Sequence, residues 1–324
     1  MKKKVSIILV VYNTSKYLRK CLTSLVNQTL KEIEIIAINN GSTDDSIDIL
    51  KEYQQKYPDI LKVIDNKAKS IGETRNEGIE HATGEYIGFI DDDDFVDTTM
   101  YEEYYKYAKE NKLDIVVGNY IKCFESTLDR IEFKVPYFDI SNIYENKQIL
   151  NKINCTSWGK IYKKDIINKN NIIFAENLKY EDVVFVYKAL INAKRIGHIN
   201  KSMYYYLIRK GSETTTVNSK IFDIFAILDI VNSYNVQDKL KEEVEYFNIN
   251  IITLYMLKQR YQKNKKLRNK FYNEGYKRLN KIEKWKQNKY YKNTNIIKRI
   301  IINNKLLLKI YCYLYQRLRI EIGI

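Results

Sequence analysis

The chain alternates between short apolar runs and segments whose apolar residues recur every three or four positions. The run Val5–Val11 is almost continuously apolar and rich in β-branched residues, which is typical of a central strand buried on both faces. Thr14 or Ser15 can cap a helix after it. The apolar positions that follow have helical spacing: Leu18, Cys21, Leu22, Leu25 and Val26. The chain therefore opens with the strand and helix of an α/β protein.

The same alternation continues as far as residue 94. It predicts strands at 33–38, 62–64 and 86–90, with a helix after the turn at residues 39–45 and another at 74–82. Strands and helices in this order predict a doubly wound, mostly parallel sheet with helices on both faces. Ligands of such sheets bind at the carboxyl ends of the strands. We therefore expect the polar clusters Asn39–Asn40 and Asp91–Asp94 to converge on one cleft.

The pattern loosens between residues 125 and 147, which favours a mobile or substrate-facing segment. Regular structure resumes near Ile149, and a helix is predicted at 182–193. From Asn218 onward the sequence is rich in Lys, Asn, Tyr and Ile and has helical periodicity. We expect an α/β domain at 1–217 and a basic, tyrosine-rich helical region at 218–324.

The formal net charge of +15 is concentrated in the second region. Residues 218–324 contain 23 Lys and Arg against 9 Asp and Glu, whereas residues 1–217 contain 32 against 31. The basic balance is therefore a property of the C-terminal third alone.

The cysteines and the N-terminus indicate the compartment. Four widely spaced cysteines and two histidines form no zinc-ligand pattern, so we expect a reducing environment without structural disulfides. The apolar run after Lys4 is short and has no small-residue cleavage site, and no apolar stretch reaches about 18 residues. These features predict a cytoplasmic protein.

Four consecutive aspartates, Asp91–Asp94, follow the predicted strand at 86–90. Neighbouring carboxylates repel one another unless they share a cation, and hard oxygen ligands on a short loop suit Mg²⁺ or Mn²⁺. The alternative is a solvated acidic turn that caps the next helix. Arg75 should lie near the same edge, where its guanidinium can pair with a phosphate, and the alternative for it is a surface helix arginine.

Seven short stretches occur in the order found in family 2 glycosyltransferases with a GT-A fold, and the chain resembles that family. Each stretch alone is a weak signal, but the ordered set spans about residues 4–216. The stretches are Val5–Asn13, Ser24–Thr29, Asn40–Ser46, Arg75–Gly78, Gly84–Asp94, Ser157–Tyr162 and Tyr180–Asp182.

The resemblance implies a site for a nucleotide-sugar donor. In similar enzymes the segment of Val11, Tyr12 and Asn13 lines the pocket of the base and ribose, with the tyrosine ring against the base. The position of Asn40 is usually an aspartate that accepts the imide proton of uracil. Here an amide replaces that charged acceptor, and a hydrogen bond to a neutral group is worth about 0.5–1.5 kcal/mol against about 1.5–3 for a charged one. We therefore expect looser selection of the base.

The resemblance also assigns the reacting groups. Asp91 and Asp93 correspond to the metal-binding acidic motif, with Asp92 near the ribose. Asp182 corresponds to the general base, and Glu181 beside it orients the acceptor or the base. A metal with Arg75 would then stabilise the departing diphosphate while a carboxylate deprotonates the acceptor hydroxyl, so a single displacement inverts the anomeric centre.

A late segment, Tyr206–Ser212, resembles a family loop that closes over the diphosphate. Arg209 and Ser212 would make the contact, and the alternative is a surface basic loop. Trp158 either stacks on an acceptor sugar or is buried.

The C-terminal stretches 296–302 and 306–315 mix apolar residues, lysines and tyrosines, a composition typical of a helix in a membrane interface. Such a helix would hold the enzyme at the inner face of the membrane, beside a lipid-linked acceptor. The alternatives are a helical cap on the catalytic domain or a homo-oligomer interface. Nucleic-acid binding is disfavoured because no recognition motif accompanies the charge.

Two other functions compete with an inverting transferase of surface-polysaccharide synthesis. A sugar-phosphate nucleotidyltransferase should have a glycine-rich loop after the first strand, where this chain has Tyr12–Ser15. A non-catalytic nucleotide-sugar-binding homologue is suggested only by Asn40, and the acidic residues Asp91, Asp93 and Asp182 argue against it.

Overall fold

A computed structural model describes residues 2–67, 69–209, 218–234, 236 and 238–318. The chain divides into two compact units, Met1–Arg209 and Lys210–Ile324, which are described separately. The boundary predicted from the sequence, between residues 217 and 218, falls at the end of a stretch that lies outside the described residues.

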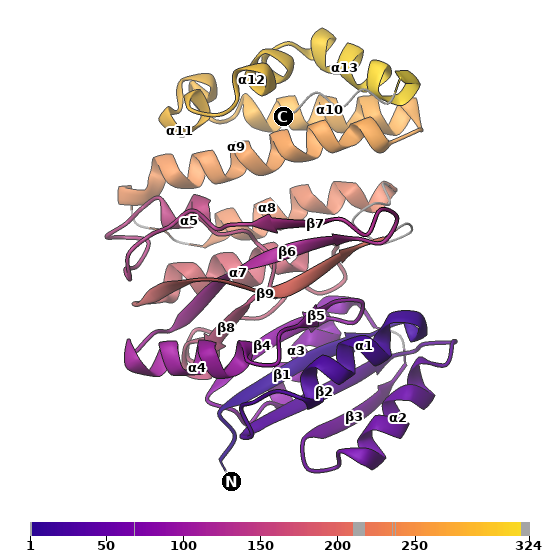
Figure 1. The fold of residues 1–324 in the computed structure, drawn as a ribbon. Helices are drawn as coiled ribbons and strands as arrows, with labels where there is room; N and C mark the ends of the chain where they lie inside the picture. Colours follow the sequence, from indigo (N-terminus) through magenta and orange to yellow (C-terminus); the bar gives the residue numbers. More distant parts are fainter. Residues whose placement is uncertain (1, 68, 210–217, 235, 237, 319–324) are drawn as a thin grey trace. The chain divides into compact units, whose positions relative to one another are not determined.

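The first unit is an α/β fold whose described strands form one nine-stranded sheet (Figure 1). Its elements are β1 Val5–Val11, α1 Ser15–Val26, β2 Ile33–Asn40, α2 Ser46–Lys56, β3 Leu61–Asn66, α3 Ile71–His81, β4 Tyr86–Asp91, β5 Phe95–Val96, α4 Met100–Glu110, β6 Ile115–Phe124, β7 Arg130–Phe133, α5 Ile149–Lys152, β8 Lys160–Lys163, α6 Lys164–Lys169, α7 Glu181–Asn192 and β9 Ile196–Ile208.

The predicted α/β, doubly wound fold is confirmed. The sheet has the order β3-β2-β1-β4-β8-β6-β9-β5, with β7 paired to β6. Its first four strands are parallel, and β8 then runs antiparallel to both β4 and β6. The sheet is therefore parallel where the sequence shows regular strand and helix alternation and mixed beyond it.

The register of the parallel strands brings polar residues together. Val11 pairs with Asn39 on β2, and Val10 pairs with Asp91 on β4. Asn40 pairs with Asn66 on β3. Three of the four parallel strands, β2, β3 and β4, therefore end in polar residues at one edge of the sheet, beside the end of β1. The convergence of Asn39–Asn40 with Asp91 is the one that the sequence predicts.

Helices cover both faces of the sheet. Buried apolar residues of α1, α2 and α4 pack with those of β1 and β2 in one core. On the other face Phe89 of β4 contacts the rings of Phe174 and Phe185, and Phe185 also contacts Tyr162. These rings fix α7, whose first residues matter below, against the sheet.

The second unit is helical. Its α-helices are α8 Asp223–Ser233, α9 Lys241–Lys258, α10 Lys265–Leu279, α11 Lys289–Lys292, α12 Ile296–Asn303 and α13 Lys305–Leu318. In the described part of the chain, no helix combines the length and the apolar character needed to cross a bilayer.

Candidate active site

The four aspartates at the end of β4 have four different environments. Asp91 Oδ1 accepts a hydrogen bond from Arg75 Nη2 at 2.9 Å. Asp92 Oδ2 accepts one from the backbone N–H of Tyr12 at 2.9 Å and one from Thr14 Oγ1 at 2.5 Å. Asp92 therefore fastens the end of β1 to the end of β4.

The last two aspartates point toward the segment at the end of β9. Asp93 Oδ2 accepts a hydrogen bond from Arg209 Nε at 2.6 Å. Asp94 is buried and accepts hydrogen bonds from Tyr204 Oη at 2.5 Å and from the backbone N–H of Leu207 at 2.7 Å. Asp94 thus anchors β9, and through it Arg209, beside the acidic turn. Ser212, predicted to act with Arg209, lies outside the described residues.

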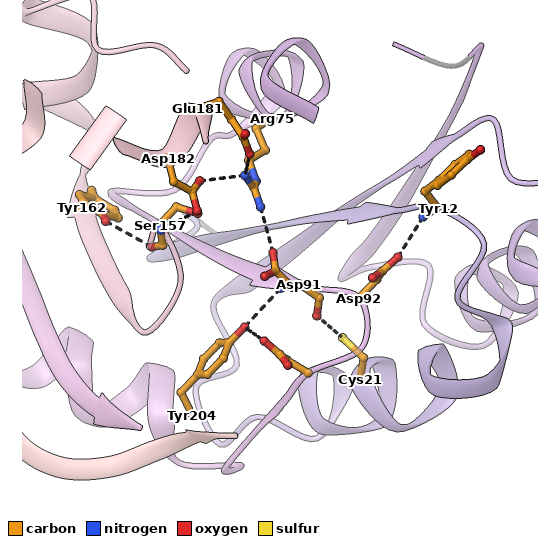
Figure 2. Close-up of polar contacts among 11 residues, drawn as sticks. Tyr12, Cys21, Arg75, Asp91, Asp92, Ser157, Tyr162, Glu181, Asp182 and Tyr204 are labelled. Carbon is orange, nitrogen blue, oxygen red and sulfur yellow. Dashed lines mark hydrogen bonds and ion pairs between the residues drawn. The ribbon is translucent and has the colours of Figure 1, made fainter. Parts of the chain in front are cut away.

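Arg75 lies at the centre of the site (Figure 2). Its Nη1 donates to Asp182 Oδ1 at 2.8 Å and to a carboxylate oxygen of Glu181, while its Nη2 donates to Asp91. The guanidinium is therefore a bridge between the acids of α7 and the acidic turn after β4. The sequence predicts a phosphate contact for Arg75, but both terminal nitrogens are bonded to carboxylates here.

Two backbone features bring α3 and α7 close enough for this bridge. A Cβ on Gly72 of α3 would lie 2.1 Å from the carbonyl oxygen of Ala175, so only glycine permits the segment before α7 to approach. Tyr180, immediately before α7, has φ +72°, a left-handed conformation that non-glycine residues seldom adopt. Glu181 and Asp182 then occupy the first turn of α7, where the helix dipole favours negative charge.

The electrostatics of the site reflect crowded carboxylates. Burial raises the pKa of Asp91 to about 6, against the opposing effect of Arg75. Burial also raises the pKa of Asp92 to about 7. Burial alone would lower the pKa of Arg75, but Asp182, Glu181 and Asp91 together raise it above its usual value. The site is thus an excess of acids arranged around one buried cation, and it favours additional positive charge.

The residues predicted to hold the base and ribose are at the end of β1. The Tyr12 side chain is 55% exposed and is available as a flat surface for an aromatic ring. Asn13 has φ +52°, and its Oδ1 accepts a hydrogen bond from the backbone N–H of Thr43 at 2.7 Å. Val11 is fully buried in the core, so its side chain lies on the far side of the strand from solvent. Of the three, only Tyr12 presents a large exposed side chain.

Asn40 has a structural function that the sequence did not suggest. Its Nδ2 donates to the carbonyl oxygen of Lys69 at 2.9 Å, and its Oδ1 accepts from the backbone N–H of Lys69 at 2.9 Å. Thr74 Oγ1 also donates to Oδ1 at 3.1 Å. The amide therefore clamps the segment before α3, and an aspartate has no N–H to complete the pair.

Replacing Asn40 by aspartate is expected to lower the free energy of unfolding by about 1–3 kcal/mol, because a carboxylate would face the Lys69 carbonyl without a donor. Urea unfolding measures the change. Asn27→Asp is the matched control, since its amide donates to the Thr23 carbonyl at an exposed site where water can substitute. Equal stability of Asn40→Asp and the native chain would contradict the clamp.

The loop before β8 supports Asp182. The backbone N–H of Ser157 donates to Asp182 Oδ2 at 3.3 Å, and Tyr162 Oη donates to the Ser157 carbonyl oxygen at 3.2 Å (Figure 2). Lys160 is buried, and its Nζ donates to Asn154 Oδ1 at 2.6 Å and to the Thr156 carbonyl oxygen at 2.8 Å. Burial lowers the pKa of Lys160 to about 7. These contacts fix the loop whose Ser157 N–H binds Asp182.

Trp158 is buried rather than available to an acceptor sugar. Its ring stacks on Tyr204 with a centroid separation of 4.5 Å and on Tyr206 with a separation of 5.2 Å. It therefore belongs to the framework that holds β9.

Sequence reasoning missed the residues that position others. Thr14, Lys160 and Tyr204 contact site residues or the loop that holds them. Thr14 stands where a helix cap is expected and Lys160 lies within the stretch Ser157–Tyr162, but neither pattern predicts these contacts, and Tyr204 stands in no local motif. Asp94 belongs to the acidic run, although its partners lie 110 residues or more away.

The acidic turn, Asp91–Asp94, can supply some of the ligands of a divalent cation, if phosphate oxygens of a bound substrate and water supply the others. Among the residues that the structure describes, no three His, Cys, Asp or Glu side chains are grouped as a metal site. Asp91 and Asp93 offer two carboxylates on one turn, and the Asp91 side chain is 33% exposed. Mg²⁺ commonly takes one or two carboxylates and completes its shell with phosphate oxygens and water. The donors therefore fit Mg²⁺ or Mn²⁺ bound together with a diphosphate.

Comparison with known proteins gives consistent matches. Residues 6–170 match the family described as glycosyl transferase family 2. The glycosyltransferase EpsH of Bacillus subtilis (strain 168) is 34% identical over 245 residues, which are 74% of this chain and 71% of EpsH. The poly(ribitol-phosphate) beta-glucosyltransferase of Bacillus spizizenii is 33% identical over 72% of this chain but only 37% of that enzyme.

The fold is similar to solved structures. The crystal structure of Staphylococcus aureus TarS 1–349 in complex with UDP-GlcNAc has a TM-score of 0.65 and covers 86% of this chain and 92% of that one. The two sequences are 20% identical. This similarity establishes that the chain has the GT-A fold. The ligands of the chain have to be inferred from the residues of its own site.

Proposed function

Because the chain belongs to glycosyl transferase family 2, a family that includes enzymes of bacterial polysaccharide synthesis, we propose that it is an inverting, metal-dependent transferase using a nucleotide diphosphate-sugar. One observation carries the proposal. Arg75 joins Asp182 and Glu181 to Asp91, so acids remote in sequence surround a single site at the strand ends.

The donor site extends along the edge of the sheet. The exposed ring of Tyr12 is suited to stack on the base, and Asp92 holds the backbone of Tyr12 in place. TarS was crystallised with UDP-GlcNAc, which supports a UDP-linked donor for this chain as well. Asn40 is occupied with Lys69, so in this proposal it shapes the pocket by fixing the segment before α3.

The diphosphate end of the donor would be held at the acidic turn. Asp91 and Asp93 would hold Mg²⁺ or Mn²⁺, which neutralises the charge that grows on the departing diphosphate. Arg209 of the β9 side is now paired with Asp93 and would contact the same phosphates. Because Arg209 lies next to Asp93, its guanidinium could bind the Asp93 carboxylate in the absence of the donor and the phosphates when the donor is bound.

Asp182 is the proposed general base. Arg75 Nη1 binds its Oδ1 and the backbone N–H of Ser157 binds its Oδ2, so the carboxylate is held in one orientation. It removes the proton from the acceptor hydroxyl as that oxygen attacks the anomeric carbon. Attack on the face opposite the leaving diphosphate inverts the configuration, and no covalent enzyme intermediate forms. Glu181, bound by the same Nη1, fixes Arg75.

The acceptor is proposed to be a glycan or a lipid-linked oligosaccharide of the cell surface. The match to a poly(ribitol-phosphate) beta-glucosyltransferase supports a surface polymer, although the match spans only part of that enzyme.

A screen of UDP-, GDP- and dTDP-sugars, each with and without Mn²⁺, tests the function. We expect release of the nucleoside diphosphate from a UDP-sugar only when metal is present. NMR of the product should show a sugar linkage of opposite anomeric configuration to the donor. A protein that binds nucleotide-sugars but never releases the diphosphate would instead be a non-catalytic homologue.

Asp93→Ala is expected to abolish the metal-dependent part of UDP binding, because one of two carboxylate ligands is lost. Isothermal titration with UDP, in the presence and absence of Mn²⁺, measures this directly. Asp59→Ala, at an exposed position before β3, is the matched control and should bind like the native chain. UDP affinity that is the same with and without Mn²⁺ in the native protein would remove the metal from the proposal.

A further inference from the structure

The helix α13 has apolar residues on two opposite sides. Leu308, Tyr311, Cys312 and Tyr315 recur at intervals of three or four and are buried. A second set with the same helical spacing is exposed to solvent: Leu306, Leu307, Ile310, Tyr313 and Leu314. An isolated surface helix normally has one apolar face, so the second set is available for another partner.

The preceding helix, α12, adds to the same surface. Ile301 and Ile302 are buried, whereas Ile296, Ile297 and Ile300 are exposed by 62%, 41% and 53%. We call the exposed apolar residues of α12 and α13 together the outer apolar face. Contiguous exposed apolar residues in this number mark an interaction site rather than ordinary surface.

The inner sides of α12 and α13 both contact helix α10 of the second unit. Tyr276 Oη of α10 donates to the Ile302 carbonyl oxygen at 2.7 Å, and Tyr272 Oη of α10 is 2.8 Å from Cys312 Sγ. Figure 1 shows α12 and α13 on the same side of α10. Their exposed sides therefore both point away from α10 and form one surface.

The segment that contains this surface is basic, although its Lys289 is paired with Glu242 and Glu243 of α9. From Trp285 to Leu318 the sequence contains eight Lys or Arg residues and no Asp or Glu. Lys305 and Lys309 are exposed, are one turn apart on α13, and border its exposed apolar side. The partner must accept apolar side chains and carry negative charge at the same place.

We propose that the outer apolar face docks on the surface of an anionic lipid bilayer. The α13 helix has 14 residues, too few to cross a bilayer, which needs about 20. It is suited to lie in the plane of the interface, with leucine and isoleucine below the headgroups and Tyr313 at headgroup depth. Lysine side chains extend from such a helix to the phosphates.

A second copy of the chain fits this surface less well. A symmetric dimer through the outer apolar face would bring two basic segments together, and the repulsion between their like charges opposes such an interface. A lipid surface supplies both the apolar phase and the anions. The proposal rests on the second unit alone and does not depend on the donor site.

Flotation of the full chain with vesicles tests the docking. The native protein should float with phosphatidylcholine vesicles that contain phosphatidylglycerol, and poorly with phosphatidylcholine alone. The variant Ile300→Gln/Leu306→Gln/Ile310→Gln should bind on the order of tenfold less or weaker, because three exposed side chains no longer enter the apolar phase. Lys305→Glu/Lys309→Glu should lose binding to a similar degree.

Leu254→Gln is the matched control, since this leucine of α9 is 43% exposed and lies outside the outer apolar face. It should float like the native chain. Circular dichroism and UDP titration should show all variants folded and unchanged in nucleotide binding. No flotation of the native chain with anionic vesicles, or equal flotation of the triple variant, would overturn the proposal. A stable dimer that the triple variant dissociates, without vesicle binding, would assign the face to a second copy instead.

Discussion

Replacing Asp182 by asparagine is expected to lower turnover by about three orders of magnitude, within the range found when a general base is lost, while UDP affinity changes little. Asparagine has the shape of aspartate, and its Oδ1 can still accept the hydrogen bond from Arg75. Its amide nitrogen cannot accept the longer hydrogen bond from the Ser157 N–H, at 3.3 Å, so only that contact is lost. It cannot accept the proton of the acceptor hydroxyl. Initial rates of UDP release and isothermal titration measure the two quantities separately.

Glu181→Gln is the matched control for this experiment. Both acids bind Arg75 Nη1, but Glu181 is more deeply buried than Asp182, with side-chain exposures of 11% and 20%. We expect a smaller loss of turnover from Glu181→Gln, because its carboxylate positions Arg75 and does not take the proton. Full turnover of Asp182→Asn would place the base elsewhere, and a larger loss from Glu181→Gln would exchange the two roles.

Arg75→Met is expected to cause the largest loss of stability, about 3–5 kcal/mol, because it removes the shared cation from buried carboxylates. Asp91, Asp182 and Glu181 would then face one another without a counter-charge. Transfer activity should be lost as well, since the bridge between α7 and the acidic turn is gone. Urea unfolding measures the stability.

Arg19→Met is the control for removal of an arginine that is bonded to a carboxylate. Arg19 makes two hydrogen bonds to Glu52, at 2.8 and 2.6 Å, but both side chains are more than half exposed. Water can replace this pair, so little change is expected. Adding Glu181→Gln to Arg75→Met should restore part of the lost stability. If Arg75→Met is as stable as Arg19→Met, the buried bridge does not hold the site together.

The sequence predicts the parallel half of the fold closely, because local patterns specify it. The strand at Val5–Val11 has the predicted bounds, and the helix predicted at 182–193 is displaced by one residue. A run of apolar residues and a helical period are properties of neighbouring residues, so they can be recognised without the tertiary structure. The antiparallel insertion of β8 between β4 and β6 has no such local signal.

The sequence predicts which residues of the site lie close together, but it does not predict which of them form hydrogen bonds with one another. Strand ends of a parallel sheet share an edge, so Asp91, Tyr12 and Asn40 were expected together. Which carboxylate Arg75 binds depends on how closely α3 approaches α7. Gly72 allows this close approach, although the two helices are about 100 residues apart in the sequence. The pairing of Asn40 with Lys69 likewise depends on the path of a loop. Such choices are made by packing and appear only in three dimensions.

A crystal structure of the full chain with UDP and Mn²⁺ would show whether the acidic turn holds a metal ion and a diphosphate together. We expect an anomalous manganese peak at Asp93 and Asp91, bound to the diphosphate, with the uracil ring against Tyr12 and Asp182 still held by Arg75. Nucleotide bound elsewhere, with no manganese at the acidic turn and the pair of Arg209 and Asp93 unchanged, would contradict it.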